Sequence, residues 1–274
     1  MSGGRLLAIG YGAIVKQTFA TLADNIAAPL ELLILYCKPG AEARAREIVA
    51  ERPSLARELL ITSDIVQAIA GKPAFAFEAA GHDALRTAGP KLLENGIDLL
   101  VSSVGALAHE MLRKQLDEAA ARGGSCCDFI PGAIGGLDIL AAAKLAGIES
   151  VTYTGRKPPK AWKGTRAETL VDLATISSEY IFFDGDAGTA ARDYPQNANV
   201  AATLALAGVG FDRTQVRLIA DPAASRNVHE ISVRSACADF TMKIEGRVSP
   251  DNPKTSLTVA YSMVSAILRR LSAP

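Results

Sequence analysis

Ile9-Gly10-Tyr11-Gly12-Ala13-Ile14-Val15 is the stretch that decides the fold, because it joins a short apolar run to a helical pattern. Arg5–Ile9 precedes it as an expected strand, and Ala13–Ala23 follows with apolar residues at helical spacing. At a strand-to-helix junction of this kind, Gly10 permits the tight turn. Gly12 has no side chain, so a pyrophosphate can approach the backbone at the helix N-terminus.

The glycine turn therefore predicts a dinucleotide site rather than a plain structural turn. Its third fingerprint position holds Val15 instead of glycine, and two glycines alone are weak evidence. The position of the turn at the first strand–helix junction of the chain is the stronger signal. We expect NAD or NADP as cofactor, bound through Gly10, Gly12, Ala13 and Ile14.

The second expected strand, Leu30–Tyr36, bears on the choice between the two cofactors. Such a strand normally ends in an acid that holds the ribose 2′-hydroxyl of NAD. Here the chain continues with Cys37 and Lys38, and Glu31 lies at the opposite end of the strand. Lys38 is placed to favour a 2′-phosphate, although a solvated surface lysine is the alternative. We predict that NADP is accepted at least as well as NAD.

Further strand–helix units follow as far as residue 135, and continuous apolar strands of this kind belong to parallel sheets covered on both faces. The sequence predicts an α/β fold with a doubly wound Rossmann domain over residues 1–135. The expected strands are Ala74–Ala80, Asp98–Val104 and Ser125–Ile130, and the expected helices are Ala41–Ala50, Asp64–Ala70, His82–Asn95 and Ala108–Arg122.

The sequence pattern of residues 136–274 differs from that of the first domain. It predicts an α+β domain for substrate binding and dimerisation. Phe240–Val248 alternates apolar and polar residues, which is typical of an antiparallel sheet with one buried face. We expect a mainly antiparallel sheet, and a last helix that packs back on the first domain. The other expected strands are Val151–Arg156, Val216–Ala220 and His229–Val233, and the expected helices are Ala167–Ser177, Asn199–Ala207 and Thr255–Leu271.

Composition excludes several classes of protein. The formal net charge of the 274 residues is zero, with none of the basic excess of a nucleic-acid binder. No apolar run reaches the roughly 18 residues that span a bilayer, and the start does not resemble a signal peptide. The four cysteines show no CxxC spacing, so we expect no metal site, free thiols and a cytoplasmic location.

Several later segments together resemble the L-aspartate dehydrogenase family, in this order over nearly the whole chain. They are Glu78–His82, Ser103–Leu107, Gly132–Asp138, Thr154–Pro159, Pro195–Ala202, Arg226–Ile231 and Asn252–Ser256. The resemblance implies oxidation of L-aspartate to iminoaspartate with NAD or NADP. The imine is then hydrolysed to oxaloacetate and ammonia, or it enters quinolinate and NAD biosynthesis.

The family pattern implies cofactor contacts at Ala133 and Asn199 and a catalytic histidine at His229. This sequence departs from the pattern at Pro131, where serine is usual, and at His109, where aspartate is common. The missing acid of the second strand is a third departure. These departures leave fine details of the site and the cofactor preference open.

His229 has the chemistry that the reaction needs. Hydride leaves the α-carbon only from a neutral amine, and a histidine with its usual pKa near 6.5 accepts the amine's proton near neutral pH. A satisfied core histidine is the alternative, because His229 shares the face of Ile231 and Val233. The substrate is expected to be held by Asn197, Arg156 and Lys254; other cations near the motifs are Lys157, Lys160, Lys163 and Arg226.

Other functions are compatible with the same two-domain organisation. Homoserine dehydrogenase and dihydrodipicolinate reductase share the two-domain organisation, so the substrate depends on the later motifs. A dinucleotide-binding protein without activity is a further alternative. A homodimer is expected because one face of the second-domain sheet needs cover.

Overall fold

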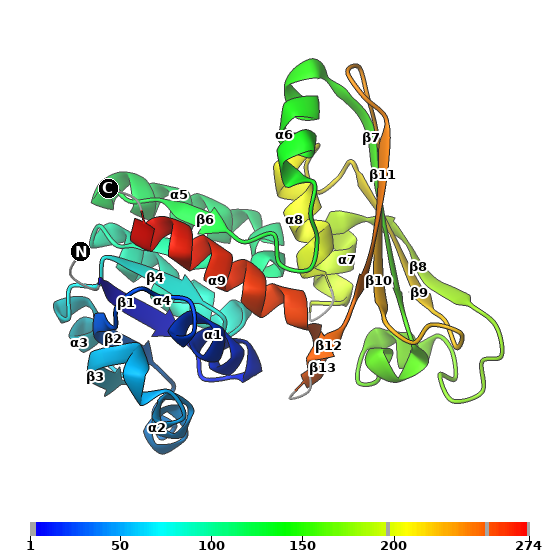
Figure 1. The fold of residues 1–274 in the computed structure, drawn as a ribbon. Coiled ribbons are helices and arrows are strands. Elements are labelled where there is room, and N and C mark those ends of the chain that lie inside the picture. Colours follow the sequence, from blue (N-terminus) through cyan, green and yellow to red (C-terminus); the bar gives the residue numbers. More distant parts are fainter. Residues whose placement is uncertain (1–3, 196–197, 250–251, 273–274) are drawn as a thin grey trace. The chain divides into compact units, whose positions relative to one another are not determined.

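The computed structural model describes residues 4–195, 198–249 and 252–272 (Figure 1). The chain divides into two compact units: Met1–Ile130 with Val259–Pro274, and Pro131–Thr258. The first unit thus ends at Ile130, slightly before the expected boundary at residue 135, and it takes in most of the C-terminal helix.

A parallel sheet forms the centre of the first unit. Its strands are β1 (Arg5–Ile9), β2 (Leu30–Tyr36), β3 (Ala56–Thr62), β4 (Phe75–Glu78), β5 (Asp98–Val101) and β6 (Cys127–Phe129). They lie in the order β3-β2-β1-β4-β5-β6, and every neighbouring pair is parallel. This is the strand order of a doubly wound Rossmann fold, so the predicted fold class of the first domain is confirmed.

Strand β3 was missing from the sequence-based expectation. It is the edge strand of the sheet, and residues 57–59 are exposed. An edge strand of this kind lacks the continuous apolar run that marks a buried parallel strand. Phe75–Glu78 is consequently the fourth strand of the sheet in chain order, not the third.

Helices cover the sheet of the first unit. They are α1 (Ala13–Ala23), α2 (Glu42–Ala50), α3 (Ile65–Ala70), α4 (His82–Glu94), α5 (Glu110–Gly123) and α9 (Leu257–Ser272). Side chains of α1 and α9, among them Phe19 and Met263, share one apolar core with strands β1 and β2. Figure 1 shows α9 beside α1. Within the described part of the chain, no helix combines the length and the apolar character that crossing a membrane requires.

The second unit contains a five-stranded mixed sheet in the order β11-β10-β7-β9-β8. Its strands are β7 (Ile148–Lys157), β8 (Tyr180–Asp186), β9 (Thr214–Ala220), β10 (Asn227–Ser235) and β11 (Phe240–Gly246). Only β7 and β9 pair in parallel. The mainly antiparallel sheet was therefore predicted correctly. A separate small ladder joins β12 (Val248–Ser249) to β13 (Asn252–Ser256).

Helices α6 (Leu137–Ala146), α7 (Ala187–Asp193) and α8 (Asn199–Ala207) lie on one side of this sheet (Figure 1). The helix expected over Ala167–Ser177 is wrong, because only a 3-10 turn forms, at Arg166–Thr169. The Asp172 carboxylate accepts a hydrogen bond from the backbone N–H of Ala174 at 3.0 Å. Local side-chain bonds of this kind compete with the helix ladder.

Candidate active site

The glycine turn between β1 and α1 leaves open space at a helix N-terminus. Gly10 has φ +115°, and a Cβ there would lie 2.9 Å from the carbonyl oxygen of Ala79, so no side chain fits. A Cβ on Gly12, in contrast, would meet no atom within 4 Å. Gly12 directly precedes α1, whose first N–H groups have no partner inside the helix. The turn fits an anionic group such as a pyrophosphate.

A cavity of about 510 Å³ opens in front of this turn. Gly10, Gly12 and Lys38 all line it, together with Ala79 and Ala80 after β4. Lys38 is exposed at the rim, just beyond the end of β2. Two further predicted residues, at positions 13 and 14, are the first residues of α1. Glu31 forms an ion pair with Arg5 at the opposite end of β2, outside this cavity.

Glu78 is a feature of this region that sequence reasoning left without a role. Its fully buried carboxylate accepts hydrogen bonds from the backbone N–H groups of Ala80 (2.7 Å), Gly81 (2.8 Å) and Ser103 (3.0 Å). The Ser103 hydroxyl donates a further bond at 2.7 Å. Burial raises the pKa of Glu78, against the lowering effect of these donors. The carboxylate ties the turns after β4 and β5 together and so shapes one wall of the cavity.

The second unit buries His229 on the helix-covered side of strand β10. Its Nδ1 lies 2.8 Å from the hydroxyl oxygen of Tyr153 on β7, and the two rings are nearly parallel, at 16°. Gly155 is the residue opposite His229 in the strand ladder. A Cβ on Gly155 would lie 2.6 Å from the Tyr153 hydroxyl, so the glycine makes room for this hydrogen bond.

The electrostatics of His229 differ from the sequence-based expectation. Burial, and after it the charge of Lys157, lower the pKa of His229 to about 3. The imidazole is therefore neutral at physiological pH. When Nδ1–H donates to the Tyr153 oxygen, Nε2 carries the free lone pair that a base needs. Burial also raises the pKa of Tyr153, which keeps its hydroxyl protonated.

Two further polar groups are buried on the same strands. Lys157 ends β7 and lies with its Nζ 5.0 Å from the centre of the Trp162 ring. Burial lowers the pKa of Lys157 to about 8. Asn227 begins β10, and its Oδ1 is buried without a hydrogen-bond partner among the described residues. The buried polar cluster thus comprises Tyr153, Lys157, Asn227 and His229.

Arg156 does not join this cluster. Neighbouring residues of a strand face opposite sides of the sheet, so Arg156 points away from the side of Tyr153 and Lys157. Its guanidinium pairs with the carboxylates of Asp221 (2.9 Å) and Glu179.

The remaining predicted residues are spread over the second unit. Ala133 is buried in the loop before α6, and Asn199 is the half-buried first residue of α8. Lys254 belongs to β13, on a part of that strand whose side chains are not described, and Asn197 lies outside the described residues. Gly136 has a packing reason for being glycine, since a Cβ there would lie 2.8 Å from Cε of Met242.

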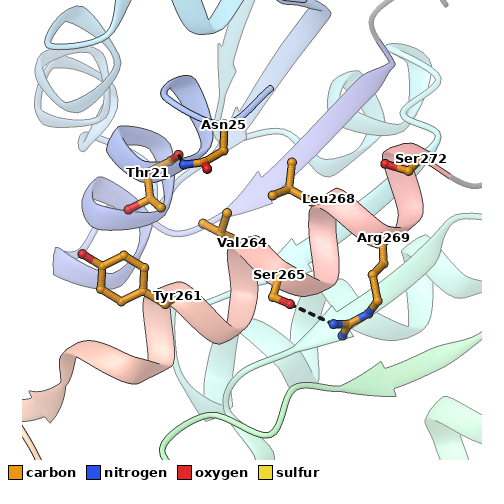
Figure 2. A pocket seen from close by; sticks show the side chains of 8 residues that line it. All are labelled: Thr21, Asn25, Tyr261, Val264, Ser265, Leu268, Arg269 and Ser272. Atoms are coloured by element: carbon orange, nitrogen blue, oxygen red, sulfur yellow. Dashed lines mark hydrogen bonds between the residues drawn. The ribbon is translucent and has the colours of Figure 1, made fainter. Parts of the chain in front are cut away.

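A second hollow in the first unit, of about 470 Å³, lies between the C-terminal end of α1 and helix α9 (Figure 2). Asn25 donates a hydrogen bond to the backbone oxygen of Thr21, and Arg269 donates one to the hydroxyl of Ser265. Two of the polar side chains of this hollow, Asn25 and Arg269, are thus paired locally. The hollow is at the opposite end of α1 from Gly12, and we assign it no role in cofactor binding.

Comparison with known sequences gives matches over nearly the whole chain. A family model described as aspartate dehydrogenase, C-terminal, matches residues 138–270, and one described as homoserine dehydrogenase, NAD binding domain, matches residues 10–128. The L-aspartate dehydrogenase of Polaromonas sp. (strain JS666) is 42% identical over 268 residues, covering 97% of both chains. That of Ralstonia nicotianae is 46% identical over 265 residues, again covering 97% of both chains.

Solved structures show the same fold. The aspartate dehydrogenase of Thermotoga maritima superimposes with a TM-score of 0.74 at 24% identity, covering 98% of this chain and 97% of that one. A hyperthermophilic archaeal homoserine dehydrogenase in complex with NADPH gives a TM-score of 0.55 at 12% identity, covering 99% of both chains. At these identities the likeness concerns the fold alone.

Proposed function

This chain belongs to the L-aspartate dehydrogenase family, and we propose that it oxidises L-aspartate to iminoaspartate with NAD or NADP as cofactor. The observation that carries the proposal is the buried pair of His229 and Tyr153, at 2.8 Å, in a chain that also has a glycine turn suited to a dinucleotide. The resemblance places the catalytic histidine of the family at His229.

The cofactor-binding residues that we propose in the first unit surround the open cavity. Gly12, with Ala13 and Ile14 behind it, receives the pyrophosphate, and Gly10 shapes the turn. Lys38 faces the ribose end of the cofactor. Ala133 and Asn199 remain proposed contacts that the family resemblance implies. When bound, the oxidised nicotinamide accepts the hydride that leaves Cα of the amino acid.

His229 serves as the base in this proposal. Nε2 takes a proton from the α-ammonium group, and the nitrogen lone pair then forms the C=N bond as hydride leaves Cα. A pKa of about 3 makes His229 a weak base in the free protein. The two carboxylates of aspartate bring negative charge to the site, which raises the pKa of a nearby imidazole. Water then adds to the imine, which releases ammonia and oxaloacetate unless the imine enters quinolinate and NAD biosynthesis.

The test is to follow formation of the reduced nicotinamide with purified protein, each cofactor and a set of amino acids. We expect turnover with L-aspartate and none with D-aspartate, and we expect ammonia in equal amount to reduced cofactor. Turnover of L-homoserine in place of L-aspartate would overturn the substrate assignment. Cofactor binding without any turnover would favour the non-catalytic alternative.

We also propose a homodimer in the cytoplasm. The side of the sheet in the second unit that faces away from α6 to α8 carries exposed residues of β10, among them Glu230, Ser232 and Arg234. These polar residues can pair with a second copy of the sheet. Light scattering at micromolar concentration tests this state, and a monomeric mass would contradict it.

A further inference from the structure

We propose that Lys157 is the cation that binds a carboxylate of the substrate beside His229. The inference rests on the proposed function, because it assigns a subsite to the anionic amino acid. Its geometric basis lies wholly in the second unit.

The strand register brings the relevant side chains to one face of the sheet. Residues two apart on a strand face the same side, so Lys157 shares a side with Gly155 and Tyr153 on β7. His229 pairs with Gly155, and Val228 pairs with Arg156. The paired register ends at Val228 and Arg156, and Asn227 and Lys157 are the next residues of the two strands. The ammonium is thus placed on the same face as the imidazole, at the end of the ladder.

The Lys157 ammonium is a buried positive charge on the histidine's face of the sheet. Lys157 is only 5% exposed, so water screens its charge poorly. The Trp162 ring lies near the ammonium, and its own Nε1–H is fixed by a 3.0 Å bond to the carbonyl oxygen of Ile219. A carboxylate that binds here supplies opposite charge in a poorly solvated place, where such pairing is strongest.

Asn227 gives a second, independent indication of a ligand. Its Oδ1 is buried without a partner among the described residues, and the residue is 2% exposed. Unpaired buried acceptors are rare in folded proteins because they lose their bonds to water. An amino acid bound between Lys157 and His229 carries N–H groups that can donate a hydrogen bond to this oxygen.

The other cations near the motif do not offer the same environment. Arg156 faces the other side of the sheet and is held by two carboxylates. Lys160 and Lys163 are exposed in the loop after β7. Lys160 therefore serves as a matched control, since it is a lysine three positions away with a solvated side chain.

Trp162 provides a direct readout, because it is the only tryptophan of the chain. We would titrate L-aspartate without cofactor, and separately succinate, and follow tryptophan emission. No turnover occurs in either titration, so failure of the proposed reaction does not affect the result. We expect a saturable change in the parent and in Lys160→Met. In Lys157→Met the dissociation constant should rise at least tenfold.

The proposal is overturned if the parent and Lys157→Met bind L-aspartate with equal affinity. It is also overturned if Lys160→Met loses as much affinity as Lys157→Met, or if the parent binds neither L-aspartate nor succinate. Lys157→Gln is a second variant in case the methionine disturbs folding, which far-ultraviolet circular dichroism monitors. The dissociation constant of the cofactor, measured in the same variants, should stay within twofold of the parent. In steady-state assays KM for aspartate should rise by more than kcat falls.

Discussion

The hydroxyl of Tyr153 lies 2.8 Å from Nδ1 of His229, although the two residues are 76 positions apart in the sequence. The bond orients the imidazole, because the hydrogen bond at one ring nitrogen decides whether the other nitrogen carries a proton or a free lone pair. Gly155 makes the bond possible by leaving the space that the hydroxyl occupies. Three residues on two neighbouring strands thus form one unit around the proposed base.

Replacement of His229 should remove catalysis and leave cofactor binding intact. We expect His229→Gln to lower kcat by about two to four orders of magnitude, the usual contribution of a general acid–base group. Tyr153→Phe should have a smaller effect of the same kind, since it removes only the partner of Nδ1. Stopped assays of reduced cofactor, together with cofactor dissociation constants, measure both. A His229→Gln variant that keeps most of its activity would show that the histidine has a packing role only.

Gly155→Ala should damage the same unit by a steric route. The new Cβ would lie 2.6 Å from the Tyr153 hydroxyl, so the tyrosine must shift away from His229. We expect a loss of stability of about 1–3 kcal/mol, typical of overpacking, together with a fall in kcat. The double variant Gly155→Ala, Tyr153→Phe should recover part of the stability but not the activity. Denaturant unfolding and steady-state assays separate the two effects.

Thr154→Ala is the matched control, because Thr154 is on the other side of the same strand. A stability loss in this control as large as that of Gly155→Ala would refute the steric explanation.

Acid should destabilise the protein through His229. Burial lowers its folded-state pKa to about 3, whereas an unfolded chain binds the proton near 6.5. The unfolded state therefore takes up a proton first, and stability present above pH 6.5 is lost as the pH falls toward 3. One proton changes the free energy of unfolding by about 1.4 kcal/mol per pH unit. Between pH 7.5 and pH 5, the free energy of unfolding should fall by about 2 kcal/mol more in the parent than in His229→Gln.

Urea unfolding of both proteins at the two pH values measures this difference. Identical pH dependence of the parent and the variant would mean that His229 titrates near its ordinary pKa.

The sequence predicts local features well and pairings between distant strands poorly. The turn at Gly10 and Gly12 depends on residues next to one another, so its role could be predicted before the fold was known. The buried side of His229 followed from alternation along one strand. Alternation along one strand did not show whether Arg156 or Lys157 lies beside His229. Neighbouring residues face opposite sides of the sheet, and only the register with β10 decides which side holds the histidine.

Glu78 illustrates a second reason why the sequence alone does not predict the whole site. A charged residue at the end of the buried run Phe75–Glu78 is a signal, but its meaning depends on Ser103, which comes from another turn. Edge strand β3 was missed because its outward residues hide the apolar pattern. Sequence patterns thus predict which helix or strand a residue belongs to. Its contact partners depend on which helices and strands pack together.

Cofactor choice should depend on Lys38. Strand β2 ends without the acid that holds a ribose 2′-hydroxyl, and Lys38 lines the cavity at the end of that strand. A lysine near a 2′-phosphate gains a charge-assisted contact, which solvent at the exposed rim weakens. We therefore expect NADP to bind at least as well as NAD. Lys38→Ala should weaken NADP about tenfold, equivalent to 1.4 kcal/mol, and leave NAD unchanged.

Dissociation constants for both cofactors on the parent and the variant decide the question, measured at low and high salt because a rim contact is screened by ions. Lys16 is a suitable control, since it is a lysine of α1 that pairs with Glu51 and is absent from the cavity lining. Lys16→Ala should leave the ratio of the two constants unchanged. A parent that strongly prefers NAD, or a Lys38→Ala variant that weakens both cofactors equally, would show that Lys38 does not recognise the 2′-position. The proposed nucleotide site would stand in that case, because it depends on the open space at Gly12 and on the tight turn at Gly10.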